Sequence, residues 1–359
     1  MFLVILIAFF SLIGLVTLHE LGHFILAKKF GVKVEEFGLG YPPRIFGKKI
    51  GETVYSLNLL PFGAFVRLPG EIEKVEDKRS FSQQSVGKRA LITLGGVLSF
   101  WVIAIVLFSI VFSLGTRVAV EDEVNHNLIN PEVQIAGISP NSPAESAKLI
   151  AGDAIIKMRS AKEEIEINKV SEVKNFVNDN LGKEISITIK RGNKTFDVSL
   201  VPRPSPPKND GPIGIVLLRT ALKKYPWWQA PWQGILAAGN ITVTIVTGWG
   251  MIIKNIIKGM PSGAQLMGPV GILNLFTQVS QLGTVYFIQF VGIISMYLAI
   301  FNILPIPALD GGKLLFLGIE ALRKKPVNEK TEQNITAFFF VLLLILIGWA
   351  TVKDIMRIF

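Results

Sequence analysis

The sequence predicts a mainly α-helical integral membrane protein with about four transmembrane helices and one inserted extracytoplasmic α+β domain. Half of the 359 residues are hydrophobic and only 18% are charged, whereas about 25% is usual in soluble proteins. Several uncharged runs approach or exceed the ~20 residues that a helix needs to cross a bilayer core. Two long polar stretches, 28–89 and 117–229, interrupt these runs. The composition therefore excludes an ordinary soluble enzyme and a disordered chain.

The uncharged runs define the expected spans. They are residues 2–18, 90–116, 230–253, 259–309 and 335–352. The chain has a net charge of +10 and no cysteine. Because the positive charge is spread over loops, it favours a membrane surface over nucleic acid as the partner. Without cysteine, disulfides, thiolate metal sites and cysteine nucleophiles are excluded.

The distribution of charge predicts the topology. The loop at 28–89 carries twelve Lys/Arg, and the loop around 323–330 is also basic. Short basic loops stay in the cytoplasm, whereas long domains cross regardless of charge. The first and last loops are therefore expected inside, and 117–229 outside. Four spans satisfy this arrangement.

The segment 232–257 is predicted to be an interfacial amphipathic helix, because a fifth span would place the basic loop at 323–330 outside. A polar stripe recurs at helical spacing along it: Asn240, Thr244, Thr247, Lys254 and Lys258. A true span, paired with a re-entrant segment at 259–281, is the alternative.

The HExxH sequence His19–His23 predicts a metal site. Residues four apart share a helix face, so His19 and His23 can bind one cation. Glu20 is placed to take a proton from a metal-bound water. Neutral imidazole suits zinc, and catalytic zinc takes three protein ligands plus water. This short pattern often arises by chance in soluble helices, but ionisable residues inside a membrane segment are costly and usually functional.

The third ligand is expected to be a carboxylate. The one remaining histidine, His126, falls in the external domain and is interpreted as a surface residue. Asp310 ends the 51-residue uncharged run on the cytoplasmic side, near the expected depth of the HExxH sequence. Glu320 is the rival ligand, and a turn or helix cap is the structural alternative for Asp310.

The segment before Asp310 is expected to be unwound. Pro305 and Pro307 break the helix there, and irregular backbone inside a membrane is tolerated where it is buried or lines a cavity. Asn302 faces this region and is a candidate for binding a substrate carbonyl. An interhelical hydrogen bond is its alternative role.

These motifs together resemble the site-2 protease family of intramembrane zinc metalloproteases, in particular the bacterial regulator-of-sigma-E proteases. The resemblance runs nearly end to end. It rests on HELGHF at 19–24, on Gly-Pro-Val-Gly-Ile at 268–272 and on N-x-x-P-x-P-x-L-D-G at 302–311. One departure is Phe100, which stands where family members often carry the asparagine of a G-x-x-x-N sequence. Another is that the branch member best known has two PDZ domains, and this chain has room for one.

The resemblance implies the roles of the site residues. His19, His23 and Asp310 would bind one zinc ion per chain. Glu20 would be the catalytic base, and Asn302 would be a substrate-binding residue. It also implies a membrane-reentrant β-hairpin, matched here by Val54–Leu68 with Pro61, Phe62 and Gly63 near its tip. An exposed edge there could add a substrate strand; a plain cytoplasmic hairpin is the alternative.

The external domain is expected to be β-rich. Residues 185–200 alternate on both sides of a Gly-Asn turn, which is typical of a hairpin. The spacing of residues 138–156 resembles a PDZ domain, which takes an extended peptide at a sheet edge; a packing module without a groove is the alternative. The expected divisions of the chain are 1–116, 117–205, 206–258 and 259–359, with a stiff proline-rich linker at 202–207.

The function predicted from these features is zinc-dependent cleavage of single-pass membrane proteins within or near their transmembrane segment. Glu20 would activate a zinc-bound water. Expected substrates are proteins such as an anti-sigma factor or a signal-peptide remnant, in a bacterial inner membrane. The alternatives are a zinc protease that uses Glu320, and a non-catalytic scaffold bearing a PDZ domain. The sequence does not predict the oligomeric state.

Overall fold

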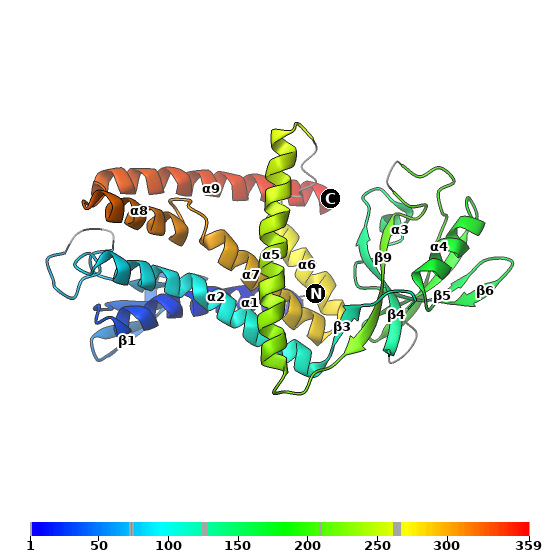
Figure 1. Ribbon diagram of the computed structural model, residues 1–359, viewed down its shortest axis with the longest axis horizontal. Helices are drawn as coiled ribbons and strands as arrows, with labels where there is room; N and C mark the ends of the chain where they lie inside the picture. The colour runs from blue at the N-terminus through cyan, green and yellow to red at the C-terminus, as the bar shows by residue number, and fades with distance from the viewer. Residues whose placement is uncertain are drawn as a thin grey trace. The chain divides into compact units, whose positions relative to one another are not determined.

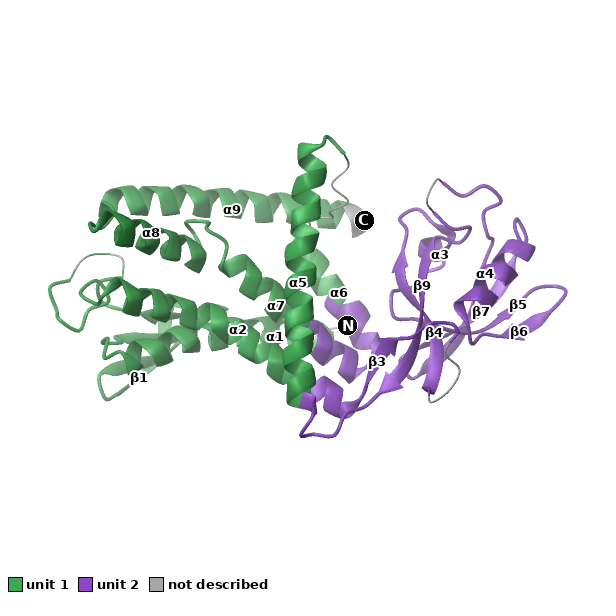
Figure 2. Cartoon of the chain, in the orientation of Figure 1, with its two compact units in different colours: residues 1–109, 231–275, 291–359 green, residues 110–230, 276–290 purple. Residues whose placement is uncertain are grey.

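The computed structural model describes residues 2–71, 73, 75–123, 128–207, 210–260 and 267–358. The chain forms two compact units (Figure 2). The first comprises Met1–Ser109, Pro231–Leu275 and Val291–Phe359, and the second comprises Ile110–Ala230 and Phe276–Phe290. His126, interpreted as a surface residue, lies outside the described residues.

Five helices among the described residues are long and apolar enough to cross a membrane. They are α1 (Phe2–Lys29), α2 (Val86–Leu114), α5 (Ala230–Ile257), α7 (Thr284–Asn302) and α9 (Glu329–Ile358). Two shorter helices are α6 (Pro269–Leu282) and α8 (Asp310–Arg323). Large apolar side chains on these helices face outward; Phe338 is 65% exposed and Val102 is 59% exposed. Such surfaces suit lipid rather than water, so the chain is a multi-pass membrane protein.

Helix α5 differs in direction from the other long helices of the first unit. It runs across α1, α2 and α9 (Figure 1). It contacts α2 through Trp101, whose Nε1 donates to Thr242 Oγ1 at 3.1 Å. The interfacial position of α5 stays a prediction, because its length and composition also fit a membrane span.

The predicted hairpin is larger than expected. Strands β1 (Glu36–Ile50) and β2 (Thr53–Arg67) pair around a turn at 51–52. The expected stretch 54–68 is therefore β2 and not a complete hairpin, since its pairing partner is β1. The sequence hides β1 because Pro42 and Pro43 interrupt its alternation.

Residues 61–63 form a second reversal, inside β2. The beginning of β1 pairs with both halves of β2, since Gly38 is opposite Ser56 and also Phe65. The reversal lies against α1. Phe62 makes an edge-to-face contact with Phe9, with ring centroids 6.1 Å apart. The hairpin thus extends along the apolar part of the first helix.

The second unit contains a seven-stranded sheet. Its order is β3-β9-β4-β5-β7-β8, and β6 also pairs with β5. The strands are β3 (Thr116–Ala119), β4 (Ile129–Ile138), β5 (Ala154–Arg159), β6 (Glu164–Glu166), β7 (Ile185–Arg191), β8 (Lys194–Leu200) and β9 (Ile215–Lys223). The helices are α3 (Pro143–Ser146) and α4 (Val170–Asp179). The predicted hairpin at 185–200 is confirmed as β7 and β8.

The core of this unit lies where the sheet meets α4. Ile155, Ile187 and Ile189 on the strands are fully buried, and Phe176 on α4 is 2% exposed. These residues belong to one apolar cluster. The sheet continues past the expected domain end at 205, because β9 pairs between β3 and β4. The stretch 206–258 is therefore only partly a linker.

Candidate metal centre

Helix α1 carries the two histidines of the HExxH sequence on one face. One helical turn separates His19 from His23, and their Nε2 atoms lie 3.3 Å apart. His19 is 8% exposed. The Nδ1 of His23 lies 2.9 Å from the backbone oxygen of Ile92. That carbonyl can only accept, so Nδ1 of His23 carries the hydrogen and Nε2 presents a lone pair.

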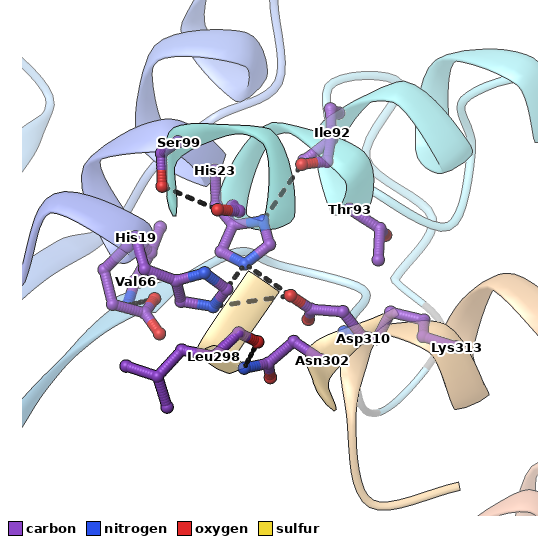
Figure 3. Close-up of polar contacts among 12 residues, drawn as sticks. His19, His23, Val66, Ile92, Thr93, Ser99, Leu298, Asn302, Asp310 and Lys313 are labelled. Atoms are coloured by element: carbon purple, nitrogen blue, oxygen red, sulfur yellow. Dashed lines mark hydrogen bonds and ion pairs between the residues drawn. The ribbon is translucent and has the colours of Figure 1, made fainter. Parts of the chain in front are cut away.

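Asp310, the first residue of α8, joins the two histidines. Its Oδ2 lies 3.3 Å from His19 Nε2 and 3.4 Å from His23 Nε2. Figure 3 shows the three side chains converging from helices far apart in the sequence. Among the described residues, these are the three that gather metal-binding atoms within 4.8 Å of one another.

The donor set fits a zinc ion. In tetrahedral coordination with bonds of about 2.05 Å, neighbouring ligand atoms lie about 3.3 Å apart. The three observed separations are 3.3, 3.3 and 3.4 Å. In addition, the Oδ2 atom of Asp310 is buried and has no hydrogen-bond partner among the described residues. A buried carboxylate oxygen without a partner is costly, and a cation between the three groups would satisfy it.

Helix α2 supplies the wall behind the histidines. The backbone at Gly96 approaches so closely that a Cβ there would collide with His23 Nε2, and would lie 2.8 Å from His19 Cε1. The ring of Phe100 stacks on His19, with centroids 4.7 Å apart and an interplanar angle of 19°. In the sequence, Phe100 stands out only as a departure from the family pattern. The HExxH motif gives no signal for either residue.

Glu20 is held by the hairpin. Its Oε2 accepts a hydrogen bond of 3.1 Å from the backbone N–H of Val66 on β2. Together with His23 and Asp310, Glu20 lines a small cavity of about 20 Å³, which is large enough for one water molecule. The carboxylate therefore faces the same small cavity as His23 and Asp310. The sequence gave no sign of the hydrogen-bond partner of Glu20 on β2.

A lysine lies one turn after Asp310. Lys313 forms an ion pair with Glu71 in the segment that follows β2. Burial lowers the pKa of Lys313, but the adjacent Glu71 carboxylate more than offsets this effect, and the pKa lies above its ordinary value. The ammonium group is therefore charged at neutral pH. The ion pair connects the end of the hairpin to the helix that carries Asp310.

The chain between α7 and α8 is not helical, as the two prolines predicted. Residues 303–309 form turns and bends between the two helices. Asn302 ends α7, and its Nδ2 donates to Leu298 O at 2.9 Å (Figure 3). This hydrogen bond lies within α7 and is not an interhelical one. The amide oxygen of Asn302 takes no part in this bond.

Glu320, the rival ligand, is engaged elsewhere. Both of its carboxylate oxygens are bound by the guanidinium of Arg89, with Nη1 at 3.1 Å from Oε2. A bidentate pair of this kind fixes the carboxylate firmly. Glu320 is not among the metal-binding atoms that gather at His19.

A groove of about 900 Å³ opens onto the site. His19, Glu20 and Asp310 form part of its lining, as does Asn302. Its walls also include residues of the hairpin, of α8 and of the first part of α9. Its volume lies within the range of about 300–1,000 Å³ that is usual for ligand pockets.

Comparison with known proteins identifies the family of the chain. The sequence profile of peptidase family M50 matches residues 7–346. The regulator of sigma-W protease RasP of Bacillus subtilis is 30% identical over the full length of both chains. The zinc metalloprotease RasP of Oceanobacillus iheyensis is 28% identical, covering 98% of this chain and 99% of its own. RasP of Geobacillus kaustophilus is also 28% identical, covering 98% of each chain. The chain therefore belongs to peptidase family M50, the site-2 protease family, and is a zinc metalloendopeptidase of the membrane.

Proposed function

We propose that this protein is an intramembrane endopeptidase that cleaves single-pass membrane proteins within or near their transmembrane segment. The observation that carries the proposal is the position of the donor set. His19 and His23 lie on a candidate membrane-spanning helix, and the Asp310 carboxylate meets them from α8. Such a cluster inside an apolar segment is costly unless it has a function.

His19, His23 and Asp310 are proposed to hold the zinc ion. A bound zinc ion supplies Lewis acidity, which activates water and polarises a carbonyl group. Glu20 takes the proton of the attacking water and returns it to the leaving amine. The Val66 N–H keeps the Glu20 carboxylate oriented for both transfers.

The groove is proposed to receive an unwound stretch of the substrate. Asn302 is proposed to donate a hydrogen bond from Nδ2 to a substrate carbonyl, since Leu298 O accepts only one of the two hydrogens on that nitrogen. Residues Pro61, Phe62 and Gly63 are proposed to contact the substrate at the membrane-reentrant end of the hairpin. The reversal at 61–63 lies against α1 between Phe9 and Val16. At 1.5 Å per residue, this range is about 5–15 Å along the helix from His19.

The β-rich domain is proposed to be a PDZ-like domain that screens substrates. One observation favours a free sheet edge. Strand β9 pairs with β4 along its length, but β3 covers only residues 220–223 on the other side. No described strand pairs with the outer edge of residues 215–218. An extended peptide could add there by main-chain hydrogen bonds.

We propose the same membrane topology that the distribution of charge predicts. The β-rich domain is extracytoplasmic, the metal centre lies toward the cytoplasm, and α5 lies at the surface of a bacterial inner membrane. The steep course of α5 across its neighbours supports an interfacial position (Figure 1). Substrates such as an anti-sigma factor or a signal-peptide remnant fit this arrangement, and one relative's name describes a protease that regulates sigma-W.

The proposal is tested by reconstituting the protein in vesicles with a single-pass substrate whose transmembrane segment contains helix-breaking residues. Mass spectrometry of the products should locate the cut within or beside that segment, and a zinc chelator should abolish it. Cuts confined to the soluble parts of the substrate would contradict intramembrane cleavage. A scaffold without activity would give no product and would contain less than about half a zinc ion per chain.

A further inference from the structure

Three tryptophans before and at the start of α5 are exposed. Trp227 is 77% exposed, Trp228 is 64% exposed and Trp232 is 61% exposed. The rings of Trp227 and Trp228 contact each other edge to face, with centroids 5.8 Å apart. Exposed aromatic surface of this size is unusual in water and indicates a partner.

The contacts of Tyr225 with α2 indicate how deep this cluster lies in the membrane. The backbone N–H of Tyr225 donates to the carbonyl of Phe112 at 3.0 Å. The two rings are also in edge-to-face contact, with centroids 5.6 Å apart. Phe112 lies two residues before the end of α2, a candidate span that closes at Leu114. Tyr225 therefore lies where α2 reaches the end of its apolar stretch.

Positive charge accompanies the aromatic residues. Lys223 and Lys224 directly precede Tyr225, and Lys223 Nζ lies 5.0 Å from the centre of the tyrosine ring. The sequence has no aspartate or glutamate from 211 to 309. Neither lysine forms an ion pair with a described residue. The charge is thus available to an anionic partner.

We propose that residues 223–232, which we call the Trp/Lys segment, anchor the protein in the membrane interface. The indole rings occupy the boundary between headgroups and hydrocarbon, where an aromatic ring with one polar group is most stable. Lys223 and Lys224 bind the headgroups of anionic phospholipids. The partner is the lipid bilayer itself, because the segment continues the level at which α2 leaves the apolar core.

The anchor fixes where α5 begins. Whether α5 spans or lies flat, its first residues stay in the interface, together with the end of β9. The proposal does not depend on proteolytic activity, since it concerns only the depth of the Trp/Lys segment.

Fluorescence quenching by brominated lipids tests this depth. The chain has six tryptophans, and a reporter that retains Trp227 and Trp228 carries phenylalanine at the other four. The full-length reporter is placed in phosphatidylcholine vesicles with bromine either near the headgroup or near the chain end. Shallow bromines are expected to quench at least about twofold more than deep ones, because interfacial indoles lie near the headgroups.

A matched control uses Trp101. It lies near the middle of α2 and is hydrogen-bonded to Thr242. A chain that retains only Trp101 should show the opposite order, with deep bromines quenching more. If the reporter does not fold, the Trp227→Phe/Trp228→Phe double variant of the natural chain serves instead. This variant should lose shallow quenching selectively.

The binding of anionic headgroups by Lys223 and Lys224 is tested with a brominated anionic lipid. At equal mole fraction, brominated phosphatidylglycerol should quench Trp227 and Trp228 more than brominated phosphatidylcholine. The Lys223→Gln/Lys224→Gln variant should lose this preference. Three results would overturn the proposal: no quenching by either lipid, stronger quenching by deep bromines, or equal quenching by both headgroups in the natural lysine background.

Discussion

The ring of Phe100 on α2 lies flat against the imidazole of His19 on α1, with ring centroids 4.7 Å apart. Phe100 is held in turn by α7, since Ser295 Oγ donates to its backbone oxygen at 2.8 Å. The stack fixes the plane of the His19 ring. We expect Phe100→Leu to weaken zinc binding about tenfold or more, as loss of a group that orients a ligand does.

The measurement is a competition titration for zinc with a coloured chelator. Phe108→Leu is the matched control. Phe108 is also 2% exposed on α2, but it packs beside Gly292 on α7 rather than against a metal ligand. Both variants should lose similar stability from the smaller side chain. Equal zinc affinity in the two variants would show that Phe100 only fills space.

Gly96 is expected to tolerate no side chain. A Cβ at this position would collide with the imidazole of His23. Gly96→Ala should therefore displace a histidine and reduce both zinc content and cleavage. Gly87→Ala on the same helix is the control, because no atom lies within 4 Å of its added Cβ. That substitution should stabilise the helix by about 0.5–1 kcal/mol. Normal zinc content in Gly96→Ala would show that α2 can retreat.

Asp310 and Glu320 are distinguished by paired substitutions. Asp310→Asn removes a charged ligand and should lower the zinc content of purified protein below about half an ion per chain. Glu320→Gln should retain zinc, because the Glu320 carboxylate is bound to Arg89. Elemental analysis gives the stoichiometry. The opposite result would favour Glu320 as the third ligand.

Glu20→Gln separates metal binding from chemistry. The amide is isosteric and can still accept the hydrogen bond from Val66 N, so the site should keep its shape. Without a proton acceptor, cleavage should fall by about 10²–10⁴-fold, while zinc content stays the same. The readouts are product formation in vesicles and elemental analysis. Activity close to that of the natural chain would remove Glu20 from the mechanism.

The hydrogen bonds of Asp122 predict that the stability of α4 in the β-rich domain depends on pH. Its carboxylate accepts 3.0 Å hydrogen bonds from the N–H groups of Val170 and Ser171, which begin α4. Partial burial raises the pKa of Asp122, but these hydrogen bonds outweigh it, and the pKa lies below its ordinary value. The stabilisation is therefore complete above the unfolded pKa of about 4 and is lost as pH falls through the lower folded pKa.

The change to test is Asp122→Asn. At neutral pH it should reduce the protection of α4 amides against hydrogen exchange by about 0.5–1 kcal/mol, the lower end of a capping contribution because solvent screens the group. The difference from the natural chain should vanish at acidic pH. Asp179→Asn, at the exposed far end of α4, should cause no such loss. A pH-independent difference would show that the carboxylate charge plays no part.

The parts of the site that follow from local spacing could be predicted from the sequence. His19 and His23 are four residues apart in a helix, so their shared face is fixed by helix geometry. Asp310 could be predicted by elimination, since the chain lacks cysteine and His126 falls in the external polar stretch. The unwound segment at 303–309 follows from Pro305 and Pro307.

The missed contacts join distant parts of the chain. Val66 reaches Glu20 across 46 residues, and Ile92 reaches His23 across 69 residues. No local pattern encodes which backbone group will face a ligand after helices pack. Strand β1 was missed for a different reason: its two prolines remove the alternation that identifies strands, and pairing with β2 compensates for them.

The donor atoms at positions 19, 23 and 310 also set the order of events during synthesis. The first helix leaves the ribosome early, but the aspartate emerges only when nearly the whole chain has been made. Until α8 reaches α1, the nascent protein lacks the third donor. A truncated translation product that ends before Asp310 thus lacks the complete donor set.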